Sequence, residues 1–450
     1  MDQWVGIILA AGRGVRMRSR IPKVLHPICG KEMILYSVEK LLSLGLQRVI
    51  LVVSPDNIDA IRQVVGDIVE YVIQTEPNGT GSALEDAMGV VGDNCSHILV
   101  HNADMPLVSY ESLHRLTESH KENGYAMTLL TMDDVVSEDL GCISRDEQQS
   151  ICDVIESVDR AVPDYDAFEV NLGTYCFQAK WLVNELTNVM PRDNGELYLT
   201  DLVRIGYTYN GSIGSVFARD RVECLGVNNR VQLSNVETVQ RRRIVERLML
   251  SGVTIQNPET VIIDDSVKVG QDTTILPNTI LIGNTDIGEQ CYIGPWTMIN
   301  DCTVGNSCTV NSSQLEESIL KDNVEIGPFS HLRSGCVLET NTHIGNYVEM
   351  KETTFGNGST CGHFSYLGDA DISEDVNIGA GTVTCNYDGI EKHQTLIEQG
   401  AFIGCDTMLV APVVVGKGAS TGAGSVVVAN IPDGRLAVGV PARIVDQRNN

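Results

Sequence analysis

A cluster of basic residues follows the first apolar segment of the chain, and its spacing suits a phosphate-rich ligand. The segment reads Leu9-Ala10-Ala11-Gly12-Arg13-Gly14-Val15-Arg16-Met17, followed by Pro22-Lys23-Val24-Leu25. Glycine lets the backbone approach a phosphate closely, and arginine and lysine neutralise its charge. The pattern is neither a P-loop nor the three-glycine dinucleotide fingerprint. We expect it to bind an anion such as a triphosphate.

Two further residues have the chemistry of a metal ligand and of a proton carrier. Asp104, in Asn102-Ala103-Asp104, comes directly after a short apolar run, 98–100. Mg²⁺ prefers carboxylate oxygens, and the place of Asp104 after a strand favours this role over that of a turn aspartate. His363 carries an imidazole, which exchanges protons near neutral pH. A lone histidine is more often structural, so His363 needs support from the motif around it.

Alternating strands and helices position the basic segment and Asp104. Short apolar runs alternate with amphipathic stretches, which predicts strands over 5–10, 48–53 and 98–100 and a helix over 33–44. This order is typical of a Rossmann-like α/β domain with a mostly parallel sheet. Ligands bind outside the carboxyl ends of such strands, and both candidate segments lie there.

Beyond residue 251 apolar residues recur every six positions. They are Val269, Ile275, Leu281, Ile287, Ile293 and Ile299, then Ile326, Leu332, Leu338, Ile344 and Met350, then Ile397, Ile403, Leu409, Val415, Thr421 and Val427. No helix keeps a period of six, whereas a parallel β-helix points one residue of each hexad inward. Three hexads close one triangular turn, so we predict roughly ten coils. The period slips near Phe355, and an insertion over 385–394 should form an exposed loop.

The chain is long enough for two domains. At 450 residues it exceeds the size at which a single core usually splits. Charged and apolar residues interleave over 231–250, which predicts a connecting helix. We therefore predict a front domain over 1–230, the helix, and a β-helix domain over 251–450 that ends in a short tail.

Composition limits the classes of partner and the cellular compartment that we expect. The formal net charge is -27, from 59 acidic and 32 basic residues, which opposes binding to nucleic acid or to an anionic membrane. No apolar run could span a bilayer, and the N-terminus lacks the order of a signal peptide. The cysteines include no CxxC pair, so we expect free thiols and a cytoplasmic protein.

Taken together, these motifs resemble a known family. LAAGxGxRM followed by PKxL is the signature of sugar-1-phosphate nucleotidyltransferases. With the hexapeptide repeats added, the chain resembles the bifunctional N-acetylglucosamine-1-phosphate uridyltransferases/glucosamine-1-phosphate acetyltransferases of bacterial cell-wall precursor synthesis, from Ile7 to about Val428. The resemblance implies acetyl transfer from acetyl-CoA to glucosamine-1-phosphate, then uridylyl transfer from UTP to N-acetylglucosamine-1-phosphate. It also implies Mg²⁺ as cofactor, a left-handed β-helix and a homotrimer.

In the front domain the resemblance assigns each motif residue a role. Nucleotide binding is implied for Leu9, Ala10, Ala11, Gly12, Asn102 and Ala103, phosphate contact for Arg16 and Lys23, and recognition of uracil for Gln74, Gly79 and Thr80. Mg²⁺ would be held by Asp104 and Asn228, and the sugar by Gly141, Glu156 and Asn171. The chain departs from the family pattern at Asn102-Ala103. It also departs at Val158, a position at which many relatives have lysine.

In the β-helix the resemblance makes His363 the general base for the sugar amine. Arg333, Lys351 and Lys392 would neutralise the sugar phosphate, and Tyr366, Asn377 and Asn386 would orient the sugar. The residues implied on the acetyl-CoA side are Ala380, Asn386, Tyr387, Cys405 and Ala423, with the Tyr387 amide at the oxyanion. Relatives have serine in place of Cys405, and their C-terminal coenzyme arginine has no clean counterpart, Arg443 being the nearest candidate.

The motifs leave two alternatives open. In the first, the front domain activates another sugar phosphate and the β-helix is a non-catalytic oligomerisation module. In the second, the chain is a non-catalytic scaffold descended from such an enzyme. His363 and the Asn386-Tyr387 loop count against the first alternative, and the Asp104/Asn228 pair counts against the second.

Overall fold

The computed structural model describes residues 3–92, 94–135, 139–159, 168–193, 195–209 and 212–445. The chain divides into two compact units, Met1–Gln240 and Arg241–Asn450. The boundary falls inside helix α7 (Arg230–Leu250), which spans the predicted connecting helix. Within the described ranges, no helix is both long and apolar enough to cross a membrane.

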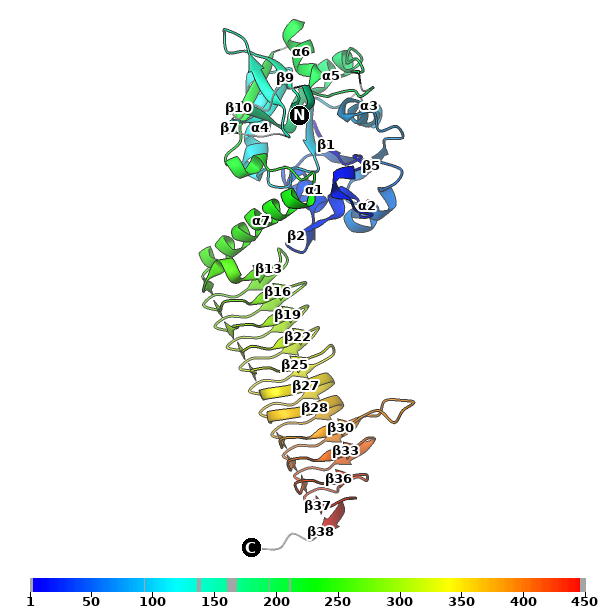
Figure 1. Ribbon diagram of the computed structural model, residues 1–450, viewed down its shortest axis with the longest axis vertical. Coiled ribbons are helices and arrows are strands. Elements are labelled where there is room, and N and C mark those ends of the chain that lie inside the picture. Colours follow the sequence, from blue (N-terminus) through cyan, green and yellow to red (C-terminus); the bar gives the residue numbers. More distant parts are fainter. Residues whose placement is uncertain are drawn as a thin grey trace. The chain divides into compact units, whose positions relative to one another are not determined.

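The first unit is built on a sheet with the strand order β11-β7-β10-β6-β1-β4-β5 (Figure 1). Its parallel part contains β1 (Trp4–Leu9), β4 (Arg48–Val53), β5 (Glu70–Ile73) and β6 (His97–Asn102). Antiparallel β10 (Phe168–Gln178) joins β6 to β7 (Met127–Val135), which pairs in parallel with β11 (Ile213–Phe217). A hairpin of β8 (Cys142–Arg145) and β9 (Ile151–Ile155) extends from β10. The predicted α/β sheet is confirmed.

Helices cover both faces of this sheet. They are α1 (Met33–Ser43), α2 (Ile58–Val65), α3 (Thr80–Val91), α4 (Tyr110–Asn123), α5 (Ala179–Leu186) and α6 (Asp201–Thr208). Successive strand residues point to opposite faces, so Ile8 packs with Ile34 of α1, and Ile7 packs in a second cluster with Leu84 of α3. Burial on both faces explains why the parallel strands read as continuous apolar runs.

The second unit is a parallel β-helix that runs from β12 (Thr254–Ile255) to β37 (Leu436–Val438), and β38 (Arg443–Val445) pairs antiparallel with β37 (Figure 1). A strand pairs with the third strand beyond it, as Ile275 pairs with Ile293 and Ile293 with Val310. The apolar hexad residues named above are buried, except for half-buried Val269. The hexapeptide repeat therefore forms the stacked coils that its period predicts.

The two departures from the period have distinct structures. Strands β27 (His343–Phe355) and β28 (Thr360–Ile372) are much longer than their neighbours and pair along most of their length. Between β30 (Val383–Cys385) and β31 (Thr395–Ile397) the chain leaves the coil as a loop, closed by an antiparallel bridge between Tyr387 and Lys392. The loop projects from the stack in Figure 1. The predicted insertion is thus an exposed hairpin-like loop.

Candidate active sites

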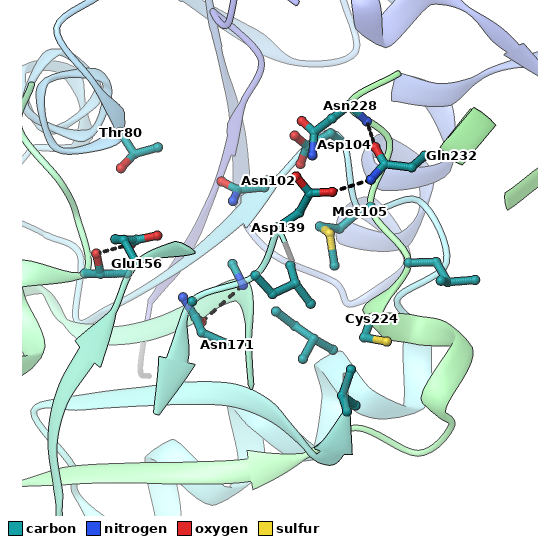
Figure 2. A pocket seen from close by; sticks show the side chains of 18 of the residues that line it. Thr80, Asn102, Asp104, Met105, Asp139, Glu156, Asn171, Cys224, Asn228 and Gln232 are labelled. Atoms are coloured by element: carbon teal, nitrogen blue, oxygen red, sulfur yellow. Dashed lines mark hydrogen bonds between the residues drawn. The ribbon is translucent and has the colours of Figure 1, made fainter. Parts of the chain in front are cut away.

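Two cavities of the first unit meet at Asp104, and Figure 2 shows one of them, the cavity that Asn171 and Asn228 line. The first, of about 450 Å³, is lined by Leu9, Ala10, Ala11, Gly12, Lys23, Gln74 and Gly79 among others. The second, of about 340 Å³, is lined by Arg16, Gly141, Glu156, Asn171 and Asn228 among others. Thr80, Asn102 and Asp104 line both cavities. Asp104 therefore stands between the residues expected at the nucleotide and those expected at the sugar.

The glycine-rich segment is held at the carboxyl end of β1. The Ala10 amide donates to the Val52 carbonyl at 2.9 Å, and buried Asn57 donates its side-chain amide to the Ala10 carbonyl at 3.1 Å. A Cβ added at Gly12 would meet no protein atom within 4 Å, so the space in front of Gly12 belongs to the cavity. Gly14 has φ +59°, and a Cβ there would lie 2.6 Å from Lys23 Cβ. This glycine lets the two halves of the basic segment pack together.

Lys23, Asp104 and Asn228 form one polar cluster. The Lys23 ammonium lies 2.6 Å from Asp104 Oδ2 and 3.3 Å from Asn228 Oδ1. Asp104 follows β6, where the Ala103 amide donates to the Leu9 carbonyl, and the Val227 amide donates to the Asp104 carbonyl at 2.9 Å. Two hard oxygens from distant parts of the chain thus share one cation. This is the donor set that a magnesium ion would use, with water and phosphate completing its shell.

A second set of polar residues supports this cluster, and sequence motifs did not point to it. Gln232 accepts from the Asn228 backbone amide at 2.8 Å, and its side-chain amide donates to Asp139 (Figure 2). Asp139 also pairs with Arg16 at 3.1 Å. Arg16, expected at the nucleotide phosphates, therefore lies in the lining of the second cavity and bonds to a carboxylate there.

The residues expected to recognise the base lie between the end of β5 and the start of α3. Gln74 is buried and donates its side-chain amide to the Gly79 carbonyl at 3.1 Å. Gly79 has φ +99°, and a Cβ there would come within 2.4 Å of the Leu197 carbonyl oxygen. Only glycine fits this close approach. Thr80 Oγ1 accepts from the Leu199 amide at 3.1 Å, which ties the start of α3 to the segment before α6.

The residues expected at the sugar line the same cavity: Gly141 just before β8, Glu156 just after β9, and Asn171 in β10. The Asn171 amide donates to the Gly141 carbonyl at 2.9 Å, and the Asn171 side chain donates to Tyr175 Oη at 2.7 Å. Thr200 Oγ1 donates to Glu156 Oε1 at 2.6 Å. Burial raises the pKa of Glu156, while the Thr200 hydrogen bond and the Arg192 charge lower it. Val158 is exposed just beyond Glu156.

In the second unit three cations gather on neighbouring coils. The Arg333 amide bonds to the Met350 carbonyl, so Arg333 and Lys351 lie one above the other. The adjacent Lys392 ammonium, and after it the Arg333 charge, lower the pKa of Lys351. Glu349 accepts from Arg333 at 3.2 Å. Mutually repelling cations are held together where an anionic ligand would relieve the repulsion.

Tyr366 and the loop residue Asn386 meet beside these cations. A Cβ added at Gly368 would lie 2.5 Å from Tyr366 Oη and 2.7 Å from Asn386 Nδ2, so both groups crowd the same glycine. His363 lies three residues before Tyr366 in β28, paired with Asn346, and is exposed. Across the part of the chain that the structure describes, its imidazole makes no hydrogen bond to protein. The ring is therefore available to a substrate.

The remaining acetyltransferase candidates follow one another along the coils. The Asp406 amide donates to the Ala380 carbonyl at 2.7 Å, and the Gly424 amide donates to the Cys405 carbonyl at 2.8 Å, which stacks Ala380, Cys405 and Ala423. Cys405 is exposed. Asn377 begins β29 (Asn377–Ile378) and accepts from Thr360 Oγ1 at 3.2 Å. Arg443 is exposed on β38, and its guanidinium bonds to the Ala442 carbonyl.

Comparison with known proteins agrees with this arrangement. Residues 6–161 match the MobA-like NTP transferase domain family, and residues 255–355 match the GMPPB C-terminal domain family. The chain is 41% identical to the "Bifunctional protein GlmU" of Exiguobacterium sibiricum, over 96% of each chain. It is also 41% identical to the proteins of that name from Geobacillus sp. (98% of this chain and 96% of the relative) and Thermosipho africanus (98% and 95%). This chain belongs to the family of bifunctional GlmU proteins.

Proposed function

We propose an assignment of residues to the two reactions of this chain. The chain is a bifunctional enzyme: it acetylates glucosamine-1-phosphate from acetyl-CoA, and it transfers a uridylyl group from UTP to N-acetylglucosamine-1-phosphate. The products of the second reaction are UDP-N-acetylglucosamine and pyrophosphate. The observation that carries our assignment is the position of Asp104, which lines both front cavities and shares a cation with Asn228.

For uridylyl transfer, we assign the larger cavity to UTP and the smaller one to the sugar phosphate. The Gln74 carbonyl would accept from uracil, and the backbone of the glycine-rich segment would approach the phosphates. A phosphate oxygen of the sugar substrate would attack the α-phosphorus of UTP, while the bond to the departing pyrophosphate breaks. Both reactants are anions, so Lys23 would contribute chiefly by neutralising charge at the junction.

A divalent metal suits this junction. Asp104 and Asn228 offer one carboxylate and one amide oxygen, few enough to leave room for phosphate oxygens and water. The Lys23 ammonium, which contacts both oxygens, supports this assignment because it is itself a cation. We assign Mg²⁺ to Asp104 and Asn228, where it would neutralise charge developing on the phosphates.

For acetyl transfer, we assign the sugar phosphate to Arg333, Lys351 and Lys392. The sugar amine would attack the thioester carbonyl, forming a C–N bond as the C–S bond breaks, and His363 would take the amine proton. The departing coenzyme thiolate is then protonated. Tyr366, Asn377 and Asn386 would orient the sugar, the Tyr387 amide would stabilise the oxyanion, and Ala380, Cys405 and Ala423 would line the coenzyme path.

We also propose a homotrimer built on the β-helix. Trp296, Phe329, Tyr347 and Phe364 are 70%, 57%, 62% and 59% exposed. The Phe329 and Tyr347 rings stack with centroids 5.4 Å apart. A run of exposed aromatic residues on a repetitive rod is typical of an association surface. Sedimentation velocity should give three chains for the native protein and fewer for Phe329→Glu/Tyr347→Glu.

We place both reactions in the cytoplasm. All thirteen cysteines are free thiols, which is typical of a reducing compartment. Cell fractionation with a compartment marker would test this assignment.

A substrate panel tests the assigned activities. Pyrophosphate release from UTP should require N-acetylglucosamine-1-phosphate and a divalent metal. Free thiol should appear from acetyl-CoA only with glucosamine-1-phosphate. Release of pyrophosphate with an unrelated sugar phosphate, or no thiol release at all, would contradict the substrate assignment.

A further inference from the structure

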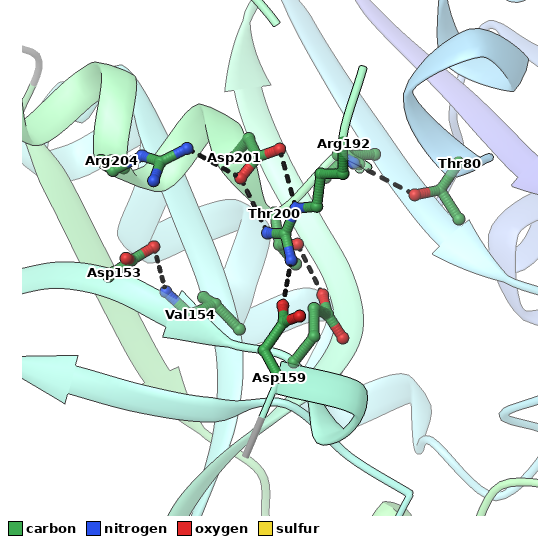
Figure 3. Close-up of polar contacts among 10 residues, drawn as sticks. Thr80, Asp153, Val154, Asp159, Arg192, Thr200, Asp201 and Arg204 are labelled. Carbon is green, nitrogen blue, oxygen red and sulfur yellow. Dashed lines mark hydrogen bonds and ion pairs between the residues drawn. The ribbon is translucent and has the colours of Figure 1, made fainter. Parts of the chain in front are cut away.

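We propose that Arg192 is a positioning residue for the sugar cavity. It holds Asp159 and Asp201 together, and this clamp fixes the cavity wall that carries Glu156 and Thr200. Figure 3 shows the Arg192 guanidinium between the two carboxylates. The inference rests on the assignment of Glu156 to the sugar. Arg192 itself does not line either front cavity.

The clamp joins two segments that are distant in sequence. Arg192 Nη2 donates to Asp201 Oδ1 at 2.8 Å and Nε donates to Asp201 Oδ2 at 3.3 Å, while Nη1 bonds to Asp159. The guanidinium also lies 4.4 Å from the centroid of the Tyr198 ring. The planar fork of arginine can serve two carboxylates and a ring at once, which a lysine ammonium cannot do.

The clamp runs beside the hydrogen bond that holds Glu156. Asp159 is three residues after Glu156, and Asp201 follows Thr200, which donates to Glu156 at 2.6 Å. Two bridges, Arg192 to Asp159 and Thr200 to Glu156, therefore connect the same two segments, and Figure 3 shows the first of them. Loss of the first bridge should loosen the second.

The same clamp sets the charge around Glu156. Burial raises the pKa of Glu156, and the carboxylates of Asp159 and Asp201 raise it further, whereas the Thr200 hydrogen bond and the Arg192 charge lower it. Burial raises the pKa of the neighbouring Tyr175 hydroxyl, the Asn171 hydrogen bond lowers it, and the Glu156 charge raises it. Without Arg192, Asp159 would lose this ion pair, and Asp201 would keep only its contact with the exposed Arg204. The pKa of Glu156 would rise, and a smaller fraction would be ionised near neutral pH.

A separate set of hydrogen bonds holds the residues assigned to the nucleotide. The Gly81 amide donates to the Leu197 carbonyl at 2.8 Å, the Leu197 amide donates to the Asn78 carbonyl at 2.7 Å, and Thr80 accepts from Leu199. These bonds do not involve Arg192. We therefore expect loss of the clamp to weaken the sugar phosphate selectively.

Arg204 provides a matched control. It is a second arginine on the same carboxylate, with Nη2 at 3.3 Å from Asp201 Oδ1, but its side chain is 61% exposed. Within the described residues, Arg204 forms no hydrogen bond or ion pair with Asp159 or Glu156, so Arg204→Ala removes an arginine from Asp201 while the clamp stays intact.

The experiment measures pyrophosphate release as a function of pH for wild type, Arg192→Ala, Arg192→Lys and Arg204→Ala. For Arg192→Ala the KM for N-acetylglucosamine-1-phosphate should rise about 10-fold or more, with the KM for UTP within about 2-fold. The acid limb of kcat/KM for the sugar phosphate should move to higher pH. For Arg192→Lys, the KM for the sugar phosphate and the position of the acid limb should lie between those of wild type and Arg192→Ala. Arg204→Ala should match wild type in both.

Asp159→Asn provides a second test of the clamp if Arg192→Ala does not fold. Removing the Asp159 charge takes away one contribution that raises the Glu156 pKa, so the acid limb should move to lower pH, opposite to Arg192→Ala. The proposal is overturned if folded Arg192→Ala behaves like Arg204→Ala, or if it changes both KM values alike with an unmoved pH profile. If the wild-type chain itself releases no pyrophosphate, the proposed function has failed instead.

Discussion

At Asp104, one carboxylate oxygen lies 2.6 Å from an ammonium while the side chain lines two cavities. This residue was predicted from its place after a strand, since the carboxyl ends of parallel strands collect ligand-binding groups. The cluster also needs Lys23, from the second half of the basic segment, and Asn228, from the residues just before α7. Spacing in the sequence cannot show that three such distant residues share one cation, and only the resemblance brought Asn228 to attention.

Other functional side chains were not predicted, because their partners come from distant segments. Asn57 supports Ala10, Gln232 supports Asn228, and Thr200 supports Glu156. None belongs to a recognisable spacing pattern in this single sequence. Arg192 likewise stands among polar residues, and only the fold brings it between Asp159 and Asp201. Residues that act through another residue are the ones that sequence patterns miss.

Chemical modification of the Cys405 thiol can test the residues assigned to the coenzyme path. The structure describes all the cysteines, and among them Cys405 is exposed while the others are buried or half-buried. Alkylation with N-ethylmaleimide should therefore block acetyl transfer and leave uridylyl transfer unchanged. Acetyl-CoA should protect the thiol, and Cys405→Ser should be active and resistant. Equal inactivation of Cys405→Ser would remove Cys405 from the coenzyme path.

At the scale of elements, the period of the sequence predicts the repeats well and their exceptions less well. Hexad apolar residues are buried because each coil repeats the same geometry. The slip near Phe355 was visible, but the two long strands β27 and β28 were not predicted. Ile344 and Met350 keep the six-residue spacing within β27, so the spacing does not distinguish one long strand from two short ones. The loop after Cys385 was recognised as an insertion, while its internal bonds depend on side chains.

The loop between β30 and β31 should be ordered by Asp388. Its Oδ1 accepts from the Ile390 and Glu391 amides at 2.7 and 2.8 Å, and its Oδ2 pairs with His393 Nε2 at 2.7 Å. The hydrogen bond from His393 and then the two amide bonds hold the pKa of Asp388 well below its usual range. Asp388 therefore stays ionised across the working pH range, and its bonds should persist.

Asp388→Ala should lower kcat/KM for acetyl transfer by about 10-fold, because the loop carries Asn386, Tyr387 and Lys392. Uridylyl transfer should not change. The matched control is Glu391→Ala, which removes an exposed acid from the same loop but keeps the backbone amide that Asp388 uses. Identical acetyl-transfer rates for the two variants would show that Asp388 does not order the loop.

At the scale of the whole molecule, the acid stability of the first unit follows from two buried histidines. Burial, and then the Lys40 charge, lower the pKa of His101 to about 3. Burial, and then His97, lower the pKa of His120 to about 4. Both are neutral in the folded chain but take up protons below about 6.5 once unfolded. The unfolded state therefore gains protons first as the pH falls, and stability is lost.

The free energy of unfolding of the first unit should fall between pH 7.5 and 5, approaching about 1.4 kcal/mol per pH unit for each histidine below pH 6.5. Urea unfolding of Trp296→Phe would report on this unit, since Trp4 and Trp181 remain there. The added change His363→Ala, at an exposed histidine of the other unit, should leave the slope unaltered. Equal stability at the two pH values would contradict the burial argument.

The central claim is that one chain carries two separate sites, one with Asp104 and one with His363. The two residues lie in different compact units, so a change in one site should spare the other reaction. The most direct measurement follows pyrophosphate release and thiol release side by side for Asp104→Asn and His363→Ala. We predict that Asp104→Asn abolishes only pyrophosphate release and that His363→Ala abolishes only thiol release. Full activity of either variant in the reaction assigned to its residue, or loss of both reactions from one change in a folded protein, would contradict the account.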